Sequence, residues 1–230
     1  MRLTFASYNI HKGVGLDRRR DPERILNVLN ELDADVVALQ EADLRFGSRA
    51  AVLPRRLLEE HRWHFAALSM KPAGMAWHGN AILVRRGIEI VGAEPIALPV
   101  LEPRGAVCAH LRVQEQEFVV VGMHLDLSGL LRRQQVRAIC HAARQRGLPA
   151  VLMGDANEWA GRGGALNAFD HTWNVLKPGR SFPSRRPIAH LDRIVHSRGW
   201  RCEGAGVHHS ALAAVASDHL PVRAELTLTA

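Results

Sequence analysis

The stretch FVVVGMHLDLSGLLRRQQVRAICHAARQRGLPAVLMGDAN, residues 118–157, decides the fold. It begins with an apolar, β-branched run that ends at His124 and closes with a second apolar run that leads to Asp155. Short apolar runs bounded by turn residues predict buried strands. Between them, apolar residues recur at helical spacing from Ser128 until just before Gly147. The stretch therefore predicts a strand–helix–strand unit with a polar side chain at the end of each strand.

The first 41 residues repeat this pattern. The run LTFASY leads to Asn9, Asp21 is a suitable helix cap, and the run ADVVALQ leads to Glu41. The spacing from Asn9 to Glu41 is 32 residues, and that from His124 to Asp155 is 31. We therefore expect an approximate internal duplication, with two sheets packed face to face, helices outside and four polar side chains at one edge.

Further short runs with strand character occur along the whole chain. The predicted strands are residues 2–8, 36–39, 81–84, 107–113, 118–123, 150–153, 191–195 and 222–228. Residues 171–189 contain three prolines and a PG pair, so we expect an irregular loop near the site. No linker or low-complexity segment interrupts the chain, which favours one domain over residues 1–230.

The composition limits the class of protein. The chain has 230 residues, of which 47% are hydrophobic, so it is long enough to bury a substantial core. No apolar run reaches the roughly 18 residues of a membrane span. The start, MRLTFASYNIHK, lacks the features of a secretory signal. We expect a monomeric cytoplasmic protein without a membrane span.

The cysteine pattern and the charge pattern limit the class of protein less than the overall composition does. Cys108, Cys140 and Cys202 are far apart and form no CxxC pair, so we expect reduced, buried thiols. The net charge of +7 would favour a polyanionic partner. However, the basic residues are nearly all arginines spread along the chain, which is more typical of a solvated surface than of a nucleic-acid-binding arm.

Polar residues at the ends of the first two strands are candidate metal ligands. Burying the carboxylate of Glu41 without a partner would cost on the order of several kcal/mol, so a cation is its natural partner. The amide of Asn9 could bind a hard cation through its oxygen or orient a carboxylate through its NH₂ group. Taken alone, Glu41 could equally be a solvated charge, and Asn9 is more often a turn residue.

The motif GDAN places Asp155 and Asn157 after a buried strand. This pair could position an attacking water and hold a phosphoryl oxygen, although a plain Asx turn has much the same residues.

Two motifs near the end of the chain add an aspartate–histidine combination. Asp192 lies within the otherwise apolar run HLDRIV, and SDH places Asp218 and His219 before the last strand. A carboxylate beside an imidazole fixes its tautomer and raises its pKa, so we expect Asp192 to pair with a histidine, most favourably His219. Taken singly, His124 or His219 is more typical of a core histidine whose hydrogen bonds are satisfied.

The order of these motifs resembles the endonuclease/exonuclease/phosphatase superfamily, which includes DNase I-like nucleases, abasic-site endonucleases, sphingomyelinases and inositol-polyphosphate 5-phosphatases. The resemblance runs from SYNIHKG through DVVALQE, GNAILV, MHLDLS, MGDANEW and HLDRI to SDHLPV, which covers nearly the whole chain. An early LQE followed by GDxN and SDH is a specific combination. The resemblance implies a DNase I-like α/β (α+β) fold, a four-layer αββα sandwich in which helices flank two packed mixed β-sheets.

The resemblance also implies roles for individual residues. Glu41 matches the principal metal-binding carboxylate, Asn9 the amide beside it, and Asp218 a further carboxylate of a Mg²⁺ or Mn²⁺ site. Asp155 matches the residue that orients or deprotonates the attacking water, and Asn157 matches a phosphate contact.

The histidines complete the comparison. His219 resembles the histidine that contacts the scissile phosphate, and Asp192 its carboxylate partner. His124 stands where nucleases and phosphatases of the superfamily carry histidine and abasic-site endonucleases usually carry tyrosine, which argues against abasic-site repair.

These observations predict a metal-dependent phosphoesterase acting on a phosphodiester or phosphomonoester, with nucleic acid as one candidate substrate. HLDRI and SDHL are also similar to motifs of tyrosyl-DNA phosphodiesterases, but aromatic residues make up only 5% of the chain, which leaves few platforms for base stacking. Trp77 and Trp159 are candidate rim contacts, although buried packing is the favoured interpretation of each.

The alternative is a catalytically silent module of the same fold that binds a phosphorylated ligand. Neither the GNH block of calcineurin-like enzymes nor the GxSxG of serine hydrolases occurs.

Overall fold

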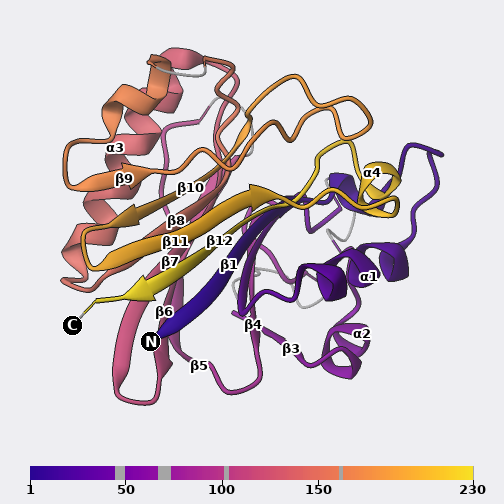
Figure 1. Ribbon diagram of the computed structural model, residues 1–230, viewed down its shortest axis with the longest axis horizontal. Helices are drawn as coiled ribbons and strands as arrows, with labels where there is room; N and C mark the ends of the chain where they lie inside the picture. The colour runs from indigo at the N-terminus through magenta and orange to yellow at the C-terminus, as the bar shows by residue number, and fades with distance from the viewer. Residues whose placement is uncertain (45–49, 67–73, 101–103, 161–162, 230) are drawn as a thin grey trace.

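Two strand–helix–strand units form the centre of the protein (Figure 1). The computed structural model describes residues 1–44, 50–66, 74–100, 104–160 and 163–229. In the first unit, helix α1 (Pro22–Leu32) connects strand β1 (Arg2–Asn9) to the parallel strand β2 (Val36–Gln40). As predicted, the side chain of Asp21 caps α1, since it accepts a hydrogen bond of 3.0 Å from the backbone N–H of Arg24.

The second unit has the same plan. Helix α3 (Gly129–Gln145) connects strand β7 (Gln116–His124) to the parallel strand β8 (Ala150–Asp155). Asn9 lies opposite Gln40 in the first unit, and His124 lies opposite Asp155 in the second. The predicted internal duplication is therefore present, and it extends to the neighbours, because each parallel pair has an antiparallel strand on both sides.

The strands form two six-stranded mixed sheets. Their orders are β11-β12-β1-β2-β4-β3 and β5-β6-β7-β8-β10-β9. The remaining strands are β3 (Trp63–Phe65), β4 (Ala81–Arg85), β5 (Glu89–Ile96), β6 (Gly105–Val113), β9 (Trp173–Val175), β10 (Asp192–Ser197), β11 (Trp200–Val207) and β12 (Val222–Leu228). The remaining helices are η1 (His11–Gly13), α2 (Arg55–Glu60), η2 (Gly164–Ala168) and α4 (Ala213–Ala216).

The two sheets pack face to face, and helices cover their outer faces (Figure 1). Side chains from both sheets, among them Phe5, Ile82, Phe118 and Val151, form the core between the sheets. Apolar side chains of α1 and α3 form separate cores on the two outer faces. The four-layer αββα sandwich predicted from the sequence is confirmed.

All eight predicted strands are present, with ends that differ by a few residues. Four strands were not predicted, and each is an edge strand or very short: β3, β5, β9 and β11. Strands β5 and β11 contain glycine, glutamate or proline and are largely exposed, so they lack the apolar alternation that marks a strand in sequence. Residues 171–189 form a mainly irregular segment, as expected, apart from β9.

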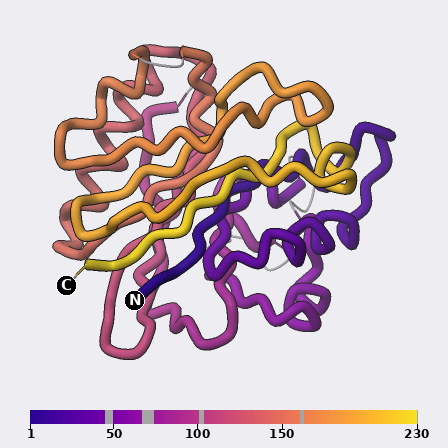
Figure 2. Tube along the Cα trace, in the orientation of Figure 1, coloured from indigo at the N-terminus to yellow at the C-terminus, as the bar shows by residue number. Residues whose placement is uncertain are grey.

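The irregular segment after β9 lies beside the chain that precedes β12 (Figure 2). The backbone N–H of Ser184 donates to the carbonyl of Asp218, and the N–H of Leu220 donates to the carbonyl of Ser181. These hydrogen bonds fix the position of the SDH motif against the second sheet.

All three cysteines are free, and Cys108 and Cys140 are buried, as predicted, whereas Cys202 is only partly covered. Within the described ranges, no helix has both the length and the apolar character that crossing a bilayer requires.

Candidate active site

The carboxylate of Asp155 is the centre of a buried polar network between the two sheets. Asp155 ends β8 and is 2% exposed. Its Oδ2 accepts a hydrogen bond of 3.2 Å from Nδ2 of Asn9 and lies 3.3 Å from Nε2 of His124. Nε2 of His219 is 3.7 Å from the same oxygen. Side chains from both sheets therefore converge on one carboxylate.

The electrostatic environment keeps Asp155 ionised. Burial acts to raise the pKa of its carboxyl group, but the hydrogen bond and charge of His124, the charge of His219 and the N–H of Asn157 together outweigh burial. The pKa of Asp155 is consequently held well below its ordinary value. The group is a hydrogen-bond acceptor at neutral pH and a weak base.

The predicted carboxylate–imidazole pair is present. Nδ1 of His219 lies 2.9 Å from Oδ2 of Asp192, and both side chains are almost fully buried. The hydroxyl of Ser181 donates to the same oxygen of Asp192 over 2.5 Å. Burial acts to lower the pKa of His219, but the charges of Asp192 and Asp155 outweigh it and raise the pKa to about 10. His219 is therefore a cation at neutral pH, with Nε2 directed towards Asp155.

Asn157 is held by the turn that follows β8. Its backbone N–H donates to Oδ1 of Asp155 over 2.9 Å, and its Nδ2 donates to the carbonyl of Leu125 over 2.9 Å. Its backbone has a left-handed conformation, with φ of 48°, which asparagine tolerates better than most residues. The Asx turn considered for GDAN is therefore real, and it positions both side chains of the motif.

Gly154 explains why the motif begins with glycine. A Cβ at this position would lie 1.8 Å from the carbonyl oxygen of Met123. Only glycine allows β7 and β8 to approach closely enough to bring His124 alongside Asp155.

Glu41 directly follows β2, and its side chain pairs with a cationic side chain from the same strand–helix–strand unit. Its carboxylate forms an ion pair with the ammonium group of Lys12 in η1. Burial acts to raise the pKa of Glu41, but Lys12 chiefly, and then His124 and His11, lower it below the ordinary value. Glu41 makes no direct contact with the Asp155 network among the interactions of the described residues, although His124 is close enough to act on its charge.

Asp218 lies beside the same network. Its Oδ1 lies 3.3 Å from the hydroxyl oxygen of Ser217 and 3.9 Å from Nδ1 of His11. The hydroxyl of Ser217 donates to the carbonyl oxygen of Asn9 over 2.7 Å. Of the eight predicted residues, hydrogen bonds or ion pairs join six. Asp218 lies next to this network through His11 and Ser217, whereas Glu41 pairs with Lys12.

Three residues of the site were missed in the sequence. The guanidinium group of Arg104 contacts Nε2 of His124, the atom that faces Asp155. Lys12 pairs with Glu41, and Ser181 holds Asp192. Lys12 has a signal in sequence, since it follows Asn9 within the turn HKG, but nothing in the pattern around Arg104 or Ser181 distinguishes them from the other arginines and serines of the chain.

Aromatic side chains continue from His219 to the surface. The ring of Phe182 is 4.8 Å from that of His219, and the ring of Trp159 is 6.1 Å from that of Phe182. Trp159 is 61% exposed, so the favoured interpretation of Trp159 as a buried packing residue is wrong. Trp77 is partly buried against the core between the sheets, which agrees with packing.

The oxygen donors at this site suit a hard cation. The described ranges contain no cluster of three or more His, Cys, Asp or Glu side chains arranged to hold a metal ion. However, Mg²⁺ is commonly bound by one or two carboxylates together with water, and Glu41, Asp218 and the amide oxygen of Asn9 are donors of that kind. Glu41 already pairs with a cation, Lys12, which shows that its carboxylate is placed to receive positive charge.

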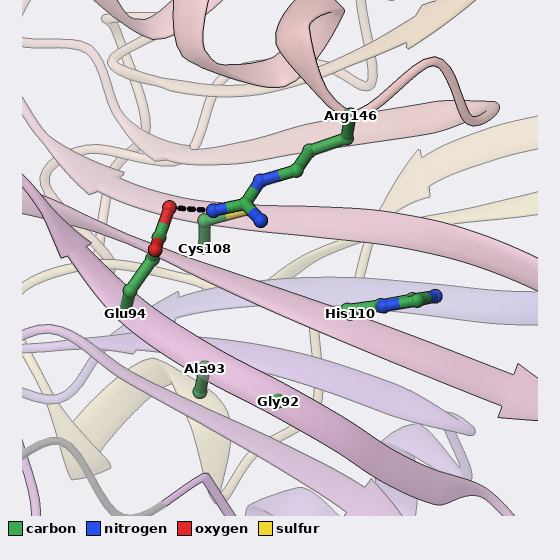
Figure 3. Close-up of a pocket in the computed structure, with 6 residues that line it drawn as sticks. All are labelled: Gly92, Ala93, Glu94, Cys108, His110 and Arg146. Carbon is green, nitrogen blue, oxygen red and sulfur yellow. Dashed lines mark ion pairs between the residues drawn. The ribbon is translucent and has the colours of Figure 1, made fainter.

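A separate hollow on the outer face of the second sheet contains none of the predicted residues (Figure 3). Arg146, just after α3, reaches across it to form an ion pair with Glu94, and Cys108 lies between them. Burial raises the pKa of the Cys108 thiol to about 11, so it is not a nucleophile at neutral pH.

The four-layer sandwich of two mixed six-stranded sheets is the DNase I-like fold, which solved structures of the endonuclease/exonuclease/phosphatase class share. The profile of the Endonuclease/Exonuclease/phosphatase family matches residues 6–219, and the chain belongs to this family. Members of the family are generally phosphoesterase hydrolases.

Individual relatives agree with this assignment. The uncharacterized protein YbhP of Escherichia coli K12 is 25% identical over 241 residues, which cover 96% of this chain and 94% of YbhP. A mannosyl-6-phosphatase of Bacteroides thetaiotaomicron has a similar structure, with a TM-score of 0.73 and 20% identity over 98% of this chain and all of the phosphatase chain. TDP2 of D. rerio in complex with a single-strand DNA product has a TM-score of 0.74 and 16% identity over 98% of this chain and 99% of its own.

Proposed function

We propose that the protein is a divalent-metal-dependent phosphoesterase that hydrolyses a phosphodiester or phosphomonoester at the Asp155 network. The observation that carries this proposal is the convergence of Asn9, His124 and His219 on the buried carboxylate of Asp155. Polar groups fixed in a buried site stabilise developing negative charge more strongly than solvated groups do.

The protonation states suggest how the residues divide the work. His219 is protonated at neutral pH, so its Nε2–H would donate to a phosphoryl oxygen and stabilise the charge of the pentacovalent transition state. Asn157 and His124 would bind further oxygens of the phosphate. Asp155 is too acidic to be a strong base, and we propose that it orients the attacking water as a hydrogen-bond acceptor.

Glu41, with Asn9 and Asp218, would hold Mg²⁺ or Mn²⁺. The chemistry that such an ion supplies when bound is neutralisation of the phosphoryl oxygens and stabilisation of the leaving oxyanion.

The relatives and the net charge of the chain indicate two candidate classes of substrate. The mannosyl-6-phosphatase supports a phosphomonoester, the DNA product bound to TDP2 supports nucleic acid, and the net charge of +7 favours an anionic substrate in either case. We propose a phosphate-ester substrate, with nucleic acid as one candidate. A monomeric protein in the cytoplasm stays a prediction.

The proposal is tested with bis-p-nitrophenyl phosphate and p-nitrophenyl phosphate as probes of diester and monoester hydrolysis. We expect the purified protein to hydrolyse at least one of them with Mg²⁺, to lose activity on chelation with EDTA and to regain it when Mg²⁺ is added. Activity that is insensitive to EDTA would contradict the metal requirement.

The alternative is the catalytically silent module that binds a phosphorylated ligand. Binding of both esters without turnover would favour this module over the enzyme. Because each catalytic position implied by the family resemblance is filled in this chain, we favour the enzyme.

A further inference from the structure

The carboxylate of Glu41 forms an ion pair with a cationic side chain of the same protein, the ammonium group of Lys12. Lys12 is one of only three lysines, with Lys71 and Lys177, among 30 lysine and arginine residues. Its ammonium group contacts Oε2 of Glu41, and the two side chains are 30% and 24% exposed. Unlike the planar guanidinium of arginine, an ammonium group is a compact, strongly hydrated point charge. A largely covered pair of this kind differs from the exposed arginine–glutamate pairs of α2.

The backbone on both sides of the pair has an unfavourable conformation. Lys12 has φ of 57° and Glu41 has φ of 56°, both in the left-handed region that residues other than glycine rarely adopt. Such conformations persist where the surrounding structure enforces them, and they concentrate at functional sites.

Specific contacts hold the backbone next to both residues. The N–H of His11 donates to Oδ1 of Asn9 over 3.1 Å at the start of η1. On the other side, the N–H of Ala42 donates to the carbonyl of Gly79 over 2.9 Å, and a Cβ on Gly79 would lie only 3.3 Å from Cα of Glu41. Because the backbone on both sides is held in place, the ammonium group of Lys12 lies against the carboxylate of Glu41. The contact therefore does not depend on two flexible surface side chains.

We propose that Lys12 is an internal counter-cation of Glu41, which stabilises the metal-free protein and must leave the carboxylate when a divalent ion binds. This inference rests on the proposed function, because it gives Glu41 the role of a metal-binding carboxylate. Since the ion and the ammonium group compete for the same oxygen, Lys12 weakens metal binding by the free energy of the ion pair.

The test measures metal affinity without substrate or turnover. Isothermal titration calorimetry with Mn²⁺ would compare the wild-type protein with Lys12→Met, which removes the charge and keeps most of the apolar stem. We expect Lys12→Met to bind Mn²⁺ at least about fivefold more tightly, which corresponds to about 1 kcal/mol at 25 °C. Lys177→Met removes the same charge from an exposed position and is expected to leave the affinity unchanged.

Unchanged or weaker Mn²⁺ binding by a folded Lys12→Met variant would overturn the inference. So would an equal gain in Lys177→Met, because the effect would then reflect net charge alone. If Lys12→Met does not fold, Lys12→Gln provides the same comparison with a polar side chain.

A third variant separates this inference from the proposed function. If Glu41→Gln binds Mn²⁺ as the wild type does, the metal role of Glu41 fails, and the inference fails with it. If Glu41→Gln loses binding while Lys12→Met matches the wild type, only the inference fails.

Discussion

At the scale of single residues, the site depends on charges that hold one another in place. Asp192 and Asp155 keep His219 protonated against the cost of burial, and His219 in turn helps to keep Asp155 ionised. Removing one charge should therefore change the protonation of its neighbour. Strongly shifted pKa values of this kind are concentrated at functional sites, although structural ion pairs also produce them.

Asp192→Asn should lower the pKa of His219 well below about 10, because burial, which favours the neutral ring, is then opposed only by the charges of Asp155 and Asp218. NMR titration of the imidazole resonances measures this pKa directly. Asp170→Asn, which removes an exposed carboxylate on the surface, should leave the pKa of His219 unchanged.

The pH dependence of the free energy of unfolding gives a second measurement of the Asp192–His219 pair. The folded pKa of His219 is above the ordinary histidine pKa of 6.5, so the pair stabilises the fold fully below pH 6.5, and this contribution is lost as pH rises towards about 10. The difference in free energy of unfolding between wild type and Asp192→Asn should shrink over that window. A difference that grows with pH would contradict the assignment.

At the scale of elements, Asn9, His124 and Asp155 are placed by strand ends whose positions depend on close contact between neighbouring strands. Gly154 is the clearest case, since any side chain there would collide with the carbonyl of Met123 on β7. Gly154→Ala should therefore separate β7 from β8 and lower the free energy of unfolding by about 3 kcal/mol, at the upper end of the usual cost of overpacking.

Chemical denaturation measures this loss. Gly206→Ala on β11 is a matched control, because a Cβ at that position meets no atom within 4 Å. The control should change stability by no more than about 0.5 kcal/mol. Equal stability of the two variants would show that the close approach of β7 and β8 does not constrain position 154.

The elements also show what the sequence could and could not predict. The buried strands and both long helices follow from apolar periodicity and caps, so the strand ends that carry Asn9, Glu41, His124 and Asp155 were found. Strands β5 and β11 were missed because they are largely exposed and are interrupted by glycine or proline, and β3 and β9 because each is only three residues long. Arg104 was missed because its role arises from a contact with His124, twenty residues away, and no local pattern records such a contact.

At the scale of the whole molecule, the duplication brings two halves of the chain to one site. Asn9 and Glu41 come from the first sheet, and His124 and Asp155 come from the second. Because the two sheets pack through the shared core, the side chain of Asn9 contacts that of Asp155, although the two residues are 146 positions apart in the sequence. The central claim is that the two halves act as one phosphoesterase site and not as two separate polar clusters.

A double-mutant cycle in Mg²⁺-dependent hydrolysis tests this claim most directly. Glu41→Gln alters the first half and Asp155→Asn the second, and each should lower kcat by a factor of about 100 or more. His141→Ala, on the exposed side of α3, is the control and should retain wild-type kcat.

Residues that act as a unit are strongly non-additive, so the double variant should lose little more activity than the more damaging single variant. Losses that multiply independently, or full activity in either single variant, would contradict the account.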